Sequence, residues 1–316
     1  MDGYSLQRKL REMLGESATS DFISTQLSYD YIYEAVLEFV KRTVLLTTTQ
    51  SITTIADTQT YNINPDYLTL YLRDIRSQYN PYYLKYNDGT TDTFIQQKAY
   101  ESIIFDNNTT SKSPPDYFTV VEQTQLSLIS GTASSNGAIN TPYTGECYLY
   151  DVSSTSKFAN VAVGDRIRNE TDGSEGYVIV KDSNTKLTCA MLGGTDNDFD
   201  SSDSYVIFPQ QRYKLYFDPA TSDASHTITL YYIQKPIPVY SYNRRYPLNQ
   251  IYELPIIQYA AFLYKYRDRE PNYGDSLFKH FELICRQNNM VTRNAKEKRG
   301  FRVNMKKHAF PDGSYR

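Results

Sequence analysis

The sequence contains no tryptophan, and its 316 residues include only three cysteines, Cys147, Cys189 and Cys285. Their number is odd, they are far apart, and no CxxC spacing occurs. Disulfide frameworks and structural zinc sites need paired or closely spaced cysteines. We therefore expect three separate buried or half-buried thiols in a reducing compartment.

Histidine is equally rare, and His226, His280 and His308 show none of the spacings that carry chemistry. The absence of an HxxxH or HExxH pair argues against a transition-metal site. No GxSxG motif offers a nucleophile, and no GxxxxGK(S/T) or GxGxxG loop offers a phosphate cradle. No pair among the 36 acidic residues is singled out as acid and base, so a hydrolase has no support. We predict that the protein is not an enzyme and uses no cofactor.

Long apolar runs are also missing. No stretch approaches the roughly 18 apolar residues that a membrane-spanning helix needs. The segment from Met1 to Leu14 mixes charges with an apolar stripe, unlike the apolar core of a secretory signal. We therefore expect neither a membrane span nor a secretory leader.

Tyrosine is the residue present in excess, with 31 copies. Its ring is large and apolar but ends in a hydroxyl group, so it suits half-buried sheet faces and subunit interfaces. The excess favours an assembly protein over a compact monomer, although extended β proteins are also rich in tyrosine.

The last 24 residues, 293–316, form a basic tail with eight Lys or Arg residues against two acidic ones. The tail therefore carries +6, which leaves −9 on the rest of a chain of net charge −3. Charge of one sign on a terminal segment steers association with a partner. A solvated tail without a partner is the alternative.

Apolar residues repeat with the helical period near both ends of the chain. This period predicts a helix that ends at Gly15 and a second from about Ser28 to Leu46, with Ser28 as its N-cap. Further along, Pro255 is placed to begin a third helix, and a fourth begins near Tyr273.

Between these segments the apolar period changes to two, which is typical of strands. Strands are predicted at 47–55, 60–64, 67–75, 117–121, 213–217 and 227–233. We expect a turn at Asp218-Pro219 and a short helix at 94–105. Residues 123–210 contain short strands between turn signals such as Asp172-Gly173, which predicts a small inserted β-barrel or sandwich.

The predicted fold class is therefore α+β, with helical segments at both ends around a strand-rich region, an inserted all-β module and an extended C-terminal arm. The expected boundaries are 1–122 and 211–292 for the helical and strand-rich core, 123–210 for the module, and 293–316 for the arm.

The weak candidate for a metal site is the acidic run at Asp196, Asp198 and Asp200, whose DxDxD spacing matches the start of a calcium loop. Its sixth position is Ser201 where glycine is needed, and its twelfth is Ile207 where glutamate is needed. We therefore expect an acidic, solvated hairpin loop and no metal.

Five segments resemble the head–tail adaptor (connector or neck) proteins of tailed bacteriophages. Three come from the predicted core: YDYIYEAVLEFVKRT (29–43), YNINPDYL (61–68) and YAAFLYKYRDREP (259–271). Two come from the module, VGDRIRNETDGSEG (163–176) and LGGTDNDF (192–199), which looks like a small β module of phage structural proteins.

The resemblance implies a virion protein that forms a dodecameric ring below the portal, binds tail or neck proteins, and lets double-stranded DNA pass. It implies contacts between subunits through Tyr29, Tyr33, Tyr264, Tyr266, Arg267 and Arg269. For the last four, interactions within the chain at a helix end are the alternative. The portal-docking arm would use Arg293, Lys296, Lys298, Arg299, Phe301, Arg302, Val303, Met305, Lys306, Lys307 and Phe310. An acidic body suits a channel in which DNA must slide, because a basic lumen would hold phosphates.

Three other functions are left open. A tail-tube or tail-hub protein would share the same composition. A carbohydrate-binding or carbohydrate-cleaving β protein could stack its tyrosines on sugars, although such sites favour the absent tryptophan. A nucleic-acid-binding protein could use the basic tail, although the overall charge of −3 argues against it.

Overall fold

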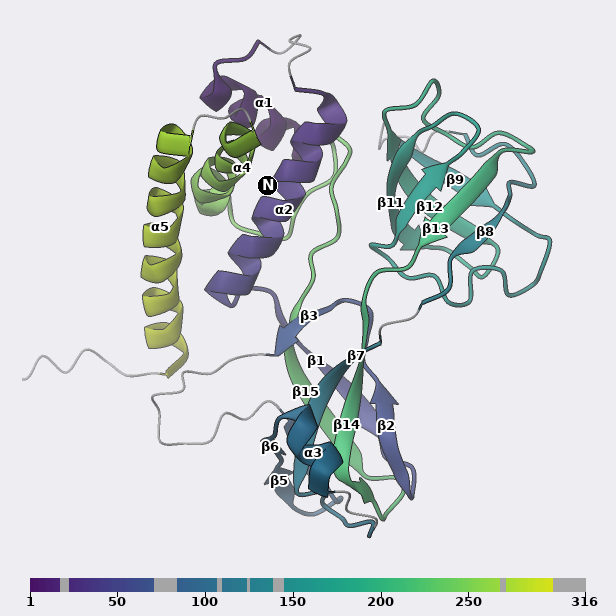
Figure 1. Ribbon diagram of the computed structural model, residues 1–316, viewed down its shortest axis with the longest axis vertical. Coiled ribbons are helices and arrows are strands. Elements are labelled where there is room, and N and C mark those ends of the chain that lie inside the picture. Colours follow the sequence, from purple (N-terminus) through teal and green to yellow (C-terminus); the bar gives the residue numbers. More distant parts are fainter. Residues whose placement is uncertain are drawn as a thin grey trace, which may run out of the picture.

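The computed structural model consists of a helical bundle beside a six-stranded sheet, with two further sheets beneath both (Figure 1). The described residues are 1–17, 23–70, 84–106, 110–123, 126–138, 145–267 and 271–297. Within helices, residues 104–106, 267, 271 and 289–297 are described by their backbone alone.

Four helices pack around one hydrophobic core. They are α1 (Gly3–Leu14), α2 (Thr25–Thr43), α4 (Glu253–Arg267) and α5 (Pro271–Glu297), with a short 3-10 turn, η1 (Gln250–Tyr252), before α4. Their apolar stripes supply fully buried residues such as Leu6, Ile32, Phe39 and Phe281. Helices from both ends of the sequence therefore form a single unit.

The helix ends follow local chemistry. Gly15 ends α1 in the left-handed conformation, with φ of 74°, as predicted. The start of α2 was predicted too late: the side chain of Ser24 accepts a hydrogen bond from Leu27 N at 3.1 Å and caps the helix. Ser28 is buried inside α2, and its hydroxyl donates to Thr25 O at 2.7 Å.

The first of the lower sheets has the order β1-β15-β4-β5, with β3 also paired to β15. Its strands are β1 (Thr47–Thr53), β3 (Tyr67–Leu70), β4 (Leu84–Asn87), β5 (Asp92–Phe94) and β15 (Thr227–Gln234). The described pairings are all antiparallel.

The second lower sheet has the order β2-β14-β7-β6. Its strands are β2 (Thr58–Asn62), β6 (Gln96–Gln97), β7 (Tyr117–Gln123) and β14 (Arg212–Thr221), and α3 (Tyr100–Asp106) precedes β7. One hydrophobic core lies between the two lower sheets, with Phe217 and Phe118 from one sheet and Leu84 and Leu230 from the other. Both sheets together are called the sandwich below.

The six-stranded sheet, called the module below, has the order β8-β13-β10-β11-β12-β9. Its strands are β8 (Ile129–Thr132), β9 (Glu146–Tyr150), β10 (Arg166–Asn169), β11 (Glu175–Lys181), β12 (Lys186–Leu192) and β13 (Ser204–Phe208). The module has a hydrophobic core of its own. It lies within the predicted range 123–210, and the predicted boundaries themselves stay a prediction.

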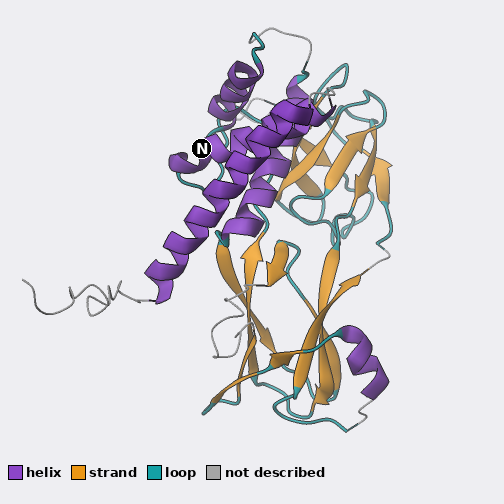
Figure 2. Ribbon diagram, turned by 60° about the vertical axis from the view of Figure 1, so that its left-hand side comes forward, coloured by secondary structure: helices purple, strands orange, loops and turns teal. Residues whose placement is uncertain are grey.

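The predicted fold class is wrong. The chain is built mainly of β-strands in three sheets, and only 27% of it is helical. The helical segments do not frame one strand-rich region from its two ends, because they pack against each other on one side of the molecule (Figure 2). The strands between them divide into separate sheets, a pairing that apolar periodicity does not encode.

Two local predictions are also corrected. The expected turn at Asp218-Pro219 lies inside β14, which continues to Thr221 with a register shift against β2. The expected helix at 94–105 is split into β5, β6 and the shorter α3. The prediction of buried thiols is confirmed, since the three cysteines are free and buried.

Among the described helices, none is both long and apolar enough to cross a lipid bilayer. The longest, α5, carries exposed polar residues such as Asp275, Lys279 and Arg286 along its outer face.

Candidate interaction surfaces

The bundle is held together by aromatic packing between α4 and α5. The Tyr259 and Phe281 ring centroids are 4.6 Å apart, and those of Phe262 and Phe278 are 5.0 Å apart. Arg42 of α2 lies over the Phe278 ring at 5.5 Å and approaches Glu282 at 3.2 Å. These contacts fix α5 against α2 and α4 along its N-terminal half.

Helix α5 is longer than the helices that support it. Its 27 residues span about 40 Å at 1.5 Å per residue, against about 28 Å for the 19 residues of α2. Both overall views show its C-terminal end extending past the rest of the bundle (Figures 1 and 2). Cys285 is the last of its described side chains that is buried. The backbone of α5 therefore continues for 12 residues past its last buried described side chain.

Several large apolar side chains of the bundle are exposed. Tyr4 and Tyr242 stack edge to face with centroids 5.3 Å apart, and each is about half exposed. Ile251 in η1 is 71% exposed, and Leu254 at the start of α4 is 49% exposed. Such groups mark a surface that contacts a partner where they form a contiguous patch, whereas single exposed apolar residues are common on proteins.

The residues predicted for subunit contacts lie in different environments. Tyr29 and Tyr33 are buried in the bundle core, and Tyr264 is 8% exposed, so these rings already pack within the chain. Their assignment to a subunit interface is therefore corrected. Tyr266 is 53% exposed and remains available, with its hydroxyl 3.3 Å from Asp275. Arg267 is described by its backbone alone, and Arg269 lies outside the described residues.

The predicted docking arm falls almost entirely outside the described residues. Arg293 and Lys296 belong to the last turns of α5, where only the backbone is described. The rest of the predicted arm lies beyond Glu297: Lys298, Arg299, Phe301, Arg302, Val303, Met305, Lys306, Lys307 and Phe310. Its role stays a prediction.

The acidic loop, residues 193–203 between β12 and β13, contains the weak metal candidates. In the described part of the chain, no group of three or more His, Cys, Asp or Glu side chains is arranged to hold a metal ion. Asp196 and Asp200 are exposed. Burial, followed by repulsion from Asp196, raises the pKa of the half-buried Asp198 to about 6.

Asn169 organises the carboxylates beside this loop. Its amide nitrogen donates to Asp172 Oδ2 at 2.8 Å, to Asp203 Oδ2 at 2.9 Å and to the carbonyl oxygen of Asp198 at 3.0 Å. Burial, then the charge of Asp203, raises the pKa of Asp172. None of these acids forms an ion pair with a described cation, so their negative charge is not balanced within the described chain.

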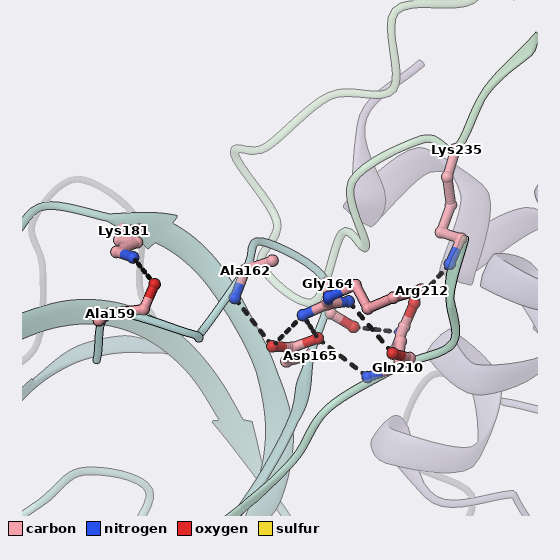
Figure 3. Close-up of polar contacts among 8 residues, drawn as sticks. All are labelled: Ala159, Ala162, Gly164, Asp165, Lys181, Gln210, Arg212 and Lys235. Atoms are coloured by element: carbon pink, nitrogen blue, oxygen red, sulfur yellow. Dashed lines mark hydrogen bonds and ion pairs between the residues drawn. The ribbon is translucent and has the colours of Figure 1, made fainter. Parts of the chain in front are cut away.

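A buried ion pair joins the module to the sandwich. Arg212, at the start of β14, places Nη2 at 2.8 Å from both carboxylate oxygens of Asp165, which precedes β10 (Figure 3). The Asp165 side chain is fully buried, and it also accepts hydrogen bonds from Ala162 N at 2.8 Å and Gln210 N at 3.0 Å. A buried charge with this many partners fixes the geometry of the junction.

Further contacts extend the junction. The Gln210 side-chain amide donates to Gly164 O, and Lys235 Nζ donates to Gln210 Oε1 at 2.7 Å. Burial, followed by repulsion from Arg212, lowers the pKa of Lys235. At the edge of the same region, Lys181 Nζ donates to Ala159 O at 2.8 Å (Figure 3).

A groove of about 760 Å³ lies at this junction. It is lined by Gln50, Asn62, Ile63, Asn64, Pro65, Gln123, Leu126, Ser127, Ile129, Ala159, Asn160, Val161, Ala162, Pro209, Arg212, Tyr213 and Lys214. The lining includes five side-chain amides and two cations, and no acid is found among these described lining residues. Lys214 forms no ion pair with any described residue. The groove therefore suits a polar or acidic polypeptide segment.

The module contacts the bundle through tyrosines and a second buried ion pair. Tyr177 of β11 lies between Tyr33 and Tyr240, with centroid distances of 5.6 and 5.2 Å. Arg244 Nε donates to the fully buried Glu146 at 2.7 Å. The module is thus held on two sides.

Sequence reasoning missed the residues of the junction. Asp165 appeared only within the segment 163–176, Lys214 only within the predicted strand 213–217, and Arg212 was not singled out. The available signal was weak. Gly164 and Asp165 stand directly before β10, and the basic residues Arg212 and Lys214 alternate just after the predicted module boundary at residue 210.

Neither a scan against protein-family models nor a search of curated proteins finds a match for this chain.

Proposed function

We propose that this protein is a non-enzymatic structural component of a phage virion, which assembles as a ring between the capsid portal and the tail. Such a protein works through surfaces that neighbouring copies and partner proteins cover. The proposal combines the resemblance of the sequence to head–tail adaptors with the shape and exposed groups of the bundle.

The overhanging part of α5 carries the proposal. The backbone of α5 continues for 12 residues past Cys285, and most helical stability in proteins comes from tertiary contacts. Neighbouring copies in a ring would supply those contacts. The exposed Ile251, Leu254, Tyr266 and Tyr273 of the same bundle support this use.

In this proposal the basic tail leaves the end of α5 and docks on the portal. A charged segment that orders on its partner attracts it at long range and then buries its apolar residues. The acidic remainder of the chain would favour the passage of DNA through the ring over its retention.

The test is a truncation after Glu297, which keeps the whole of α5 and removes residues 298–316. We expect the truncated protein to unfold at the same temperature as the full chain and to lose binding to portal rings in cosedimentation. A matched control replaces the tail by a Gly/Ser chain of equal length, and it should also fail to bind. Portal binding that survives both changes would contradict the proposed role of the tail.

A further inference from the structure

The two ends of the module carry opposite chemistry. At one end, the junction groove contains Lys214 without an acidic partner and has no acidic lining residue, and Lys181 lies at its edge. At the other end, Asp196, Asp198 and Asp200 have no described cationic partner. Each end therefore has a charge that the other end complements.

Strand pairing shows that the groove and the loop are at opposite ends. In the β10–β13 pair, Arg166 is opposite Phe208, and Asn169 is opposite Tyr205. The groove residues Ala162 and Pro209 adjoin the first pair. The acidic loop ends directly before β13, so it adjoins the second pair. About 13 Å of strand separates the two ends, and the loop of one copy cannot enter its own groove.

We infer that the acidic loop of one copy, residues 193–203, inserts into the junction groove of a neighbouring copy, where its carboxylates face Lys214. The loop connects β12 and β13 and exposes Asp196 and Asp200, and the groove has a volume typical of sites that enclose a ligand or short segment. The amides of Asn62, Gln123 and Asn160 make no described side-chain hydrogen bond, so they are free to bind the backbone of the loop.

Such a contact is head to tail, since different surfaces of identical copies meet. Contacts of this kind generate a closed ring when the rotation between copies closes, and a filament when it does not. This inference rests on the proposed assembly into a ring and names the surfaces that form it. Burial, followed by repulsion from Asp196, raises the pKa of Asp198, and a neighbouring ammonium group would relieve that repulsion.

The experiment is a charge swap on the full-length chain, with self-association measured by sedimentation velocity at low salt. Lys214→Glu should weaken self-association about tenfold or more, because it puts like charges together. Asp196→Lys combined with Asp200→Lys should have a similar effect. Combining all three substitutions should restore association. Lys112→Glu, an equal charge change at an exposed site outside the groove lining, is the control and should leave association unchanged.

Circular dichroism on each variant verifies that the fold is intact, since the substituted groups are on the surface. Self-association of Lys214→Glu at the wild-type level would overturn the loop-in-groove contact. Failure of the triple variant to regain self-association would do the same. Either result would leave the ring proposal standing. A wild-type chain that stays monomeric at every concentration, alone and with portal rings, would overturn both.

Discussion

The two ends of the module differ in the partners that surround their carboxylates. At the junction end, fully buried Asp165 has Arg212 and two backbone N–H groups as partners. At the loop end, Asp198 and Asp172 are less buried, and burial, followed by repulsion from neighbouring carboxylates, raises the pKa of each. The comparison teaches that the two ends differ in their partners: the junction supplies a cation and backbone N–H groups to its buried carboxylate, whereas the loop end supplies no described cation.

The largest expected effect is at the junction. Arg212→Ala leaves Asp165 buried without its cation, so we expect a loss of about 3–5 kcal/mol in the free energy of unfolding, measured by urea denaturation. The neighbouring Arg166, whose side chain is 56% exposed and pairs with Glu175, is the control, and Arg166→Ala should cost about 0–1 kcal/mol. If Arg212→Ala and Arg166→Ala lost equal free energies of unfolding, the buried ion pair would contribute no more to stability than the exposed one.

A smaller effect is expected at the loop end. Asn169→Ala removes the amide that donates to Asp172, Asp203 and the Asp198 carbonyl, and should cost about 1–3 kcal/mol in urea denaturation. Asn184→Ala, at an exposed turn in the same module, should change stability by less than about 0.5 kcal/mol. A loss as small as the control's would show that the carboxylates do not depend on this amide.

The smallest effect is a dependence on pH. The folded-state pKa of Asp198 is about 6, above the ordinary value of 3.8. The folded state therefore holds this proton more tightly, and stability should fall as pH rises from about 4 to about 6. Asp198→Asn should reduce this slope in thermal unfolding curves, while Asp172, whose pKa is also raised, retains part of it. An unchanged slope of stability against pH in Asp198→Asn would show that the pH dependence does not come from Asp198.

Some of this structure is predictable from the sequence, for identifiable reasons. The helical period gives α2 within a few residues, because one face of an amphipathic helix repeats regularly. That period also placed Tyr29 and Tyr33 on the apolar face of α2, which is inconsistent with a contact to another subunit. Gly15 is predictable because a left-handed residue at the end of a helix favours glycine.

The junction was not predictable in the same way. Asp165 and Arg212 are 47 residues apart, and no periodicity links them. The division of strands into three sheets depends on which strand pairs with which, and β14 and β15 each pair with several strands from distant parts of the chain. The acidic loop was recognised as a loop and rejected as a calcium site, but its position opposite the groove follows only from the β10–β13 register.

Assembly from identical copies is the central claim, and electron microscopy of the purified full-length protein at high concentration, alone and with portal rings, tests it most directly. The account predicts closed rings with rotational symmetry, or a ring of this protein on the portal. Single particles of 36.5 kDa under both conditions would contradict it.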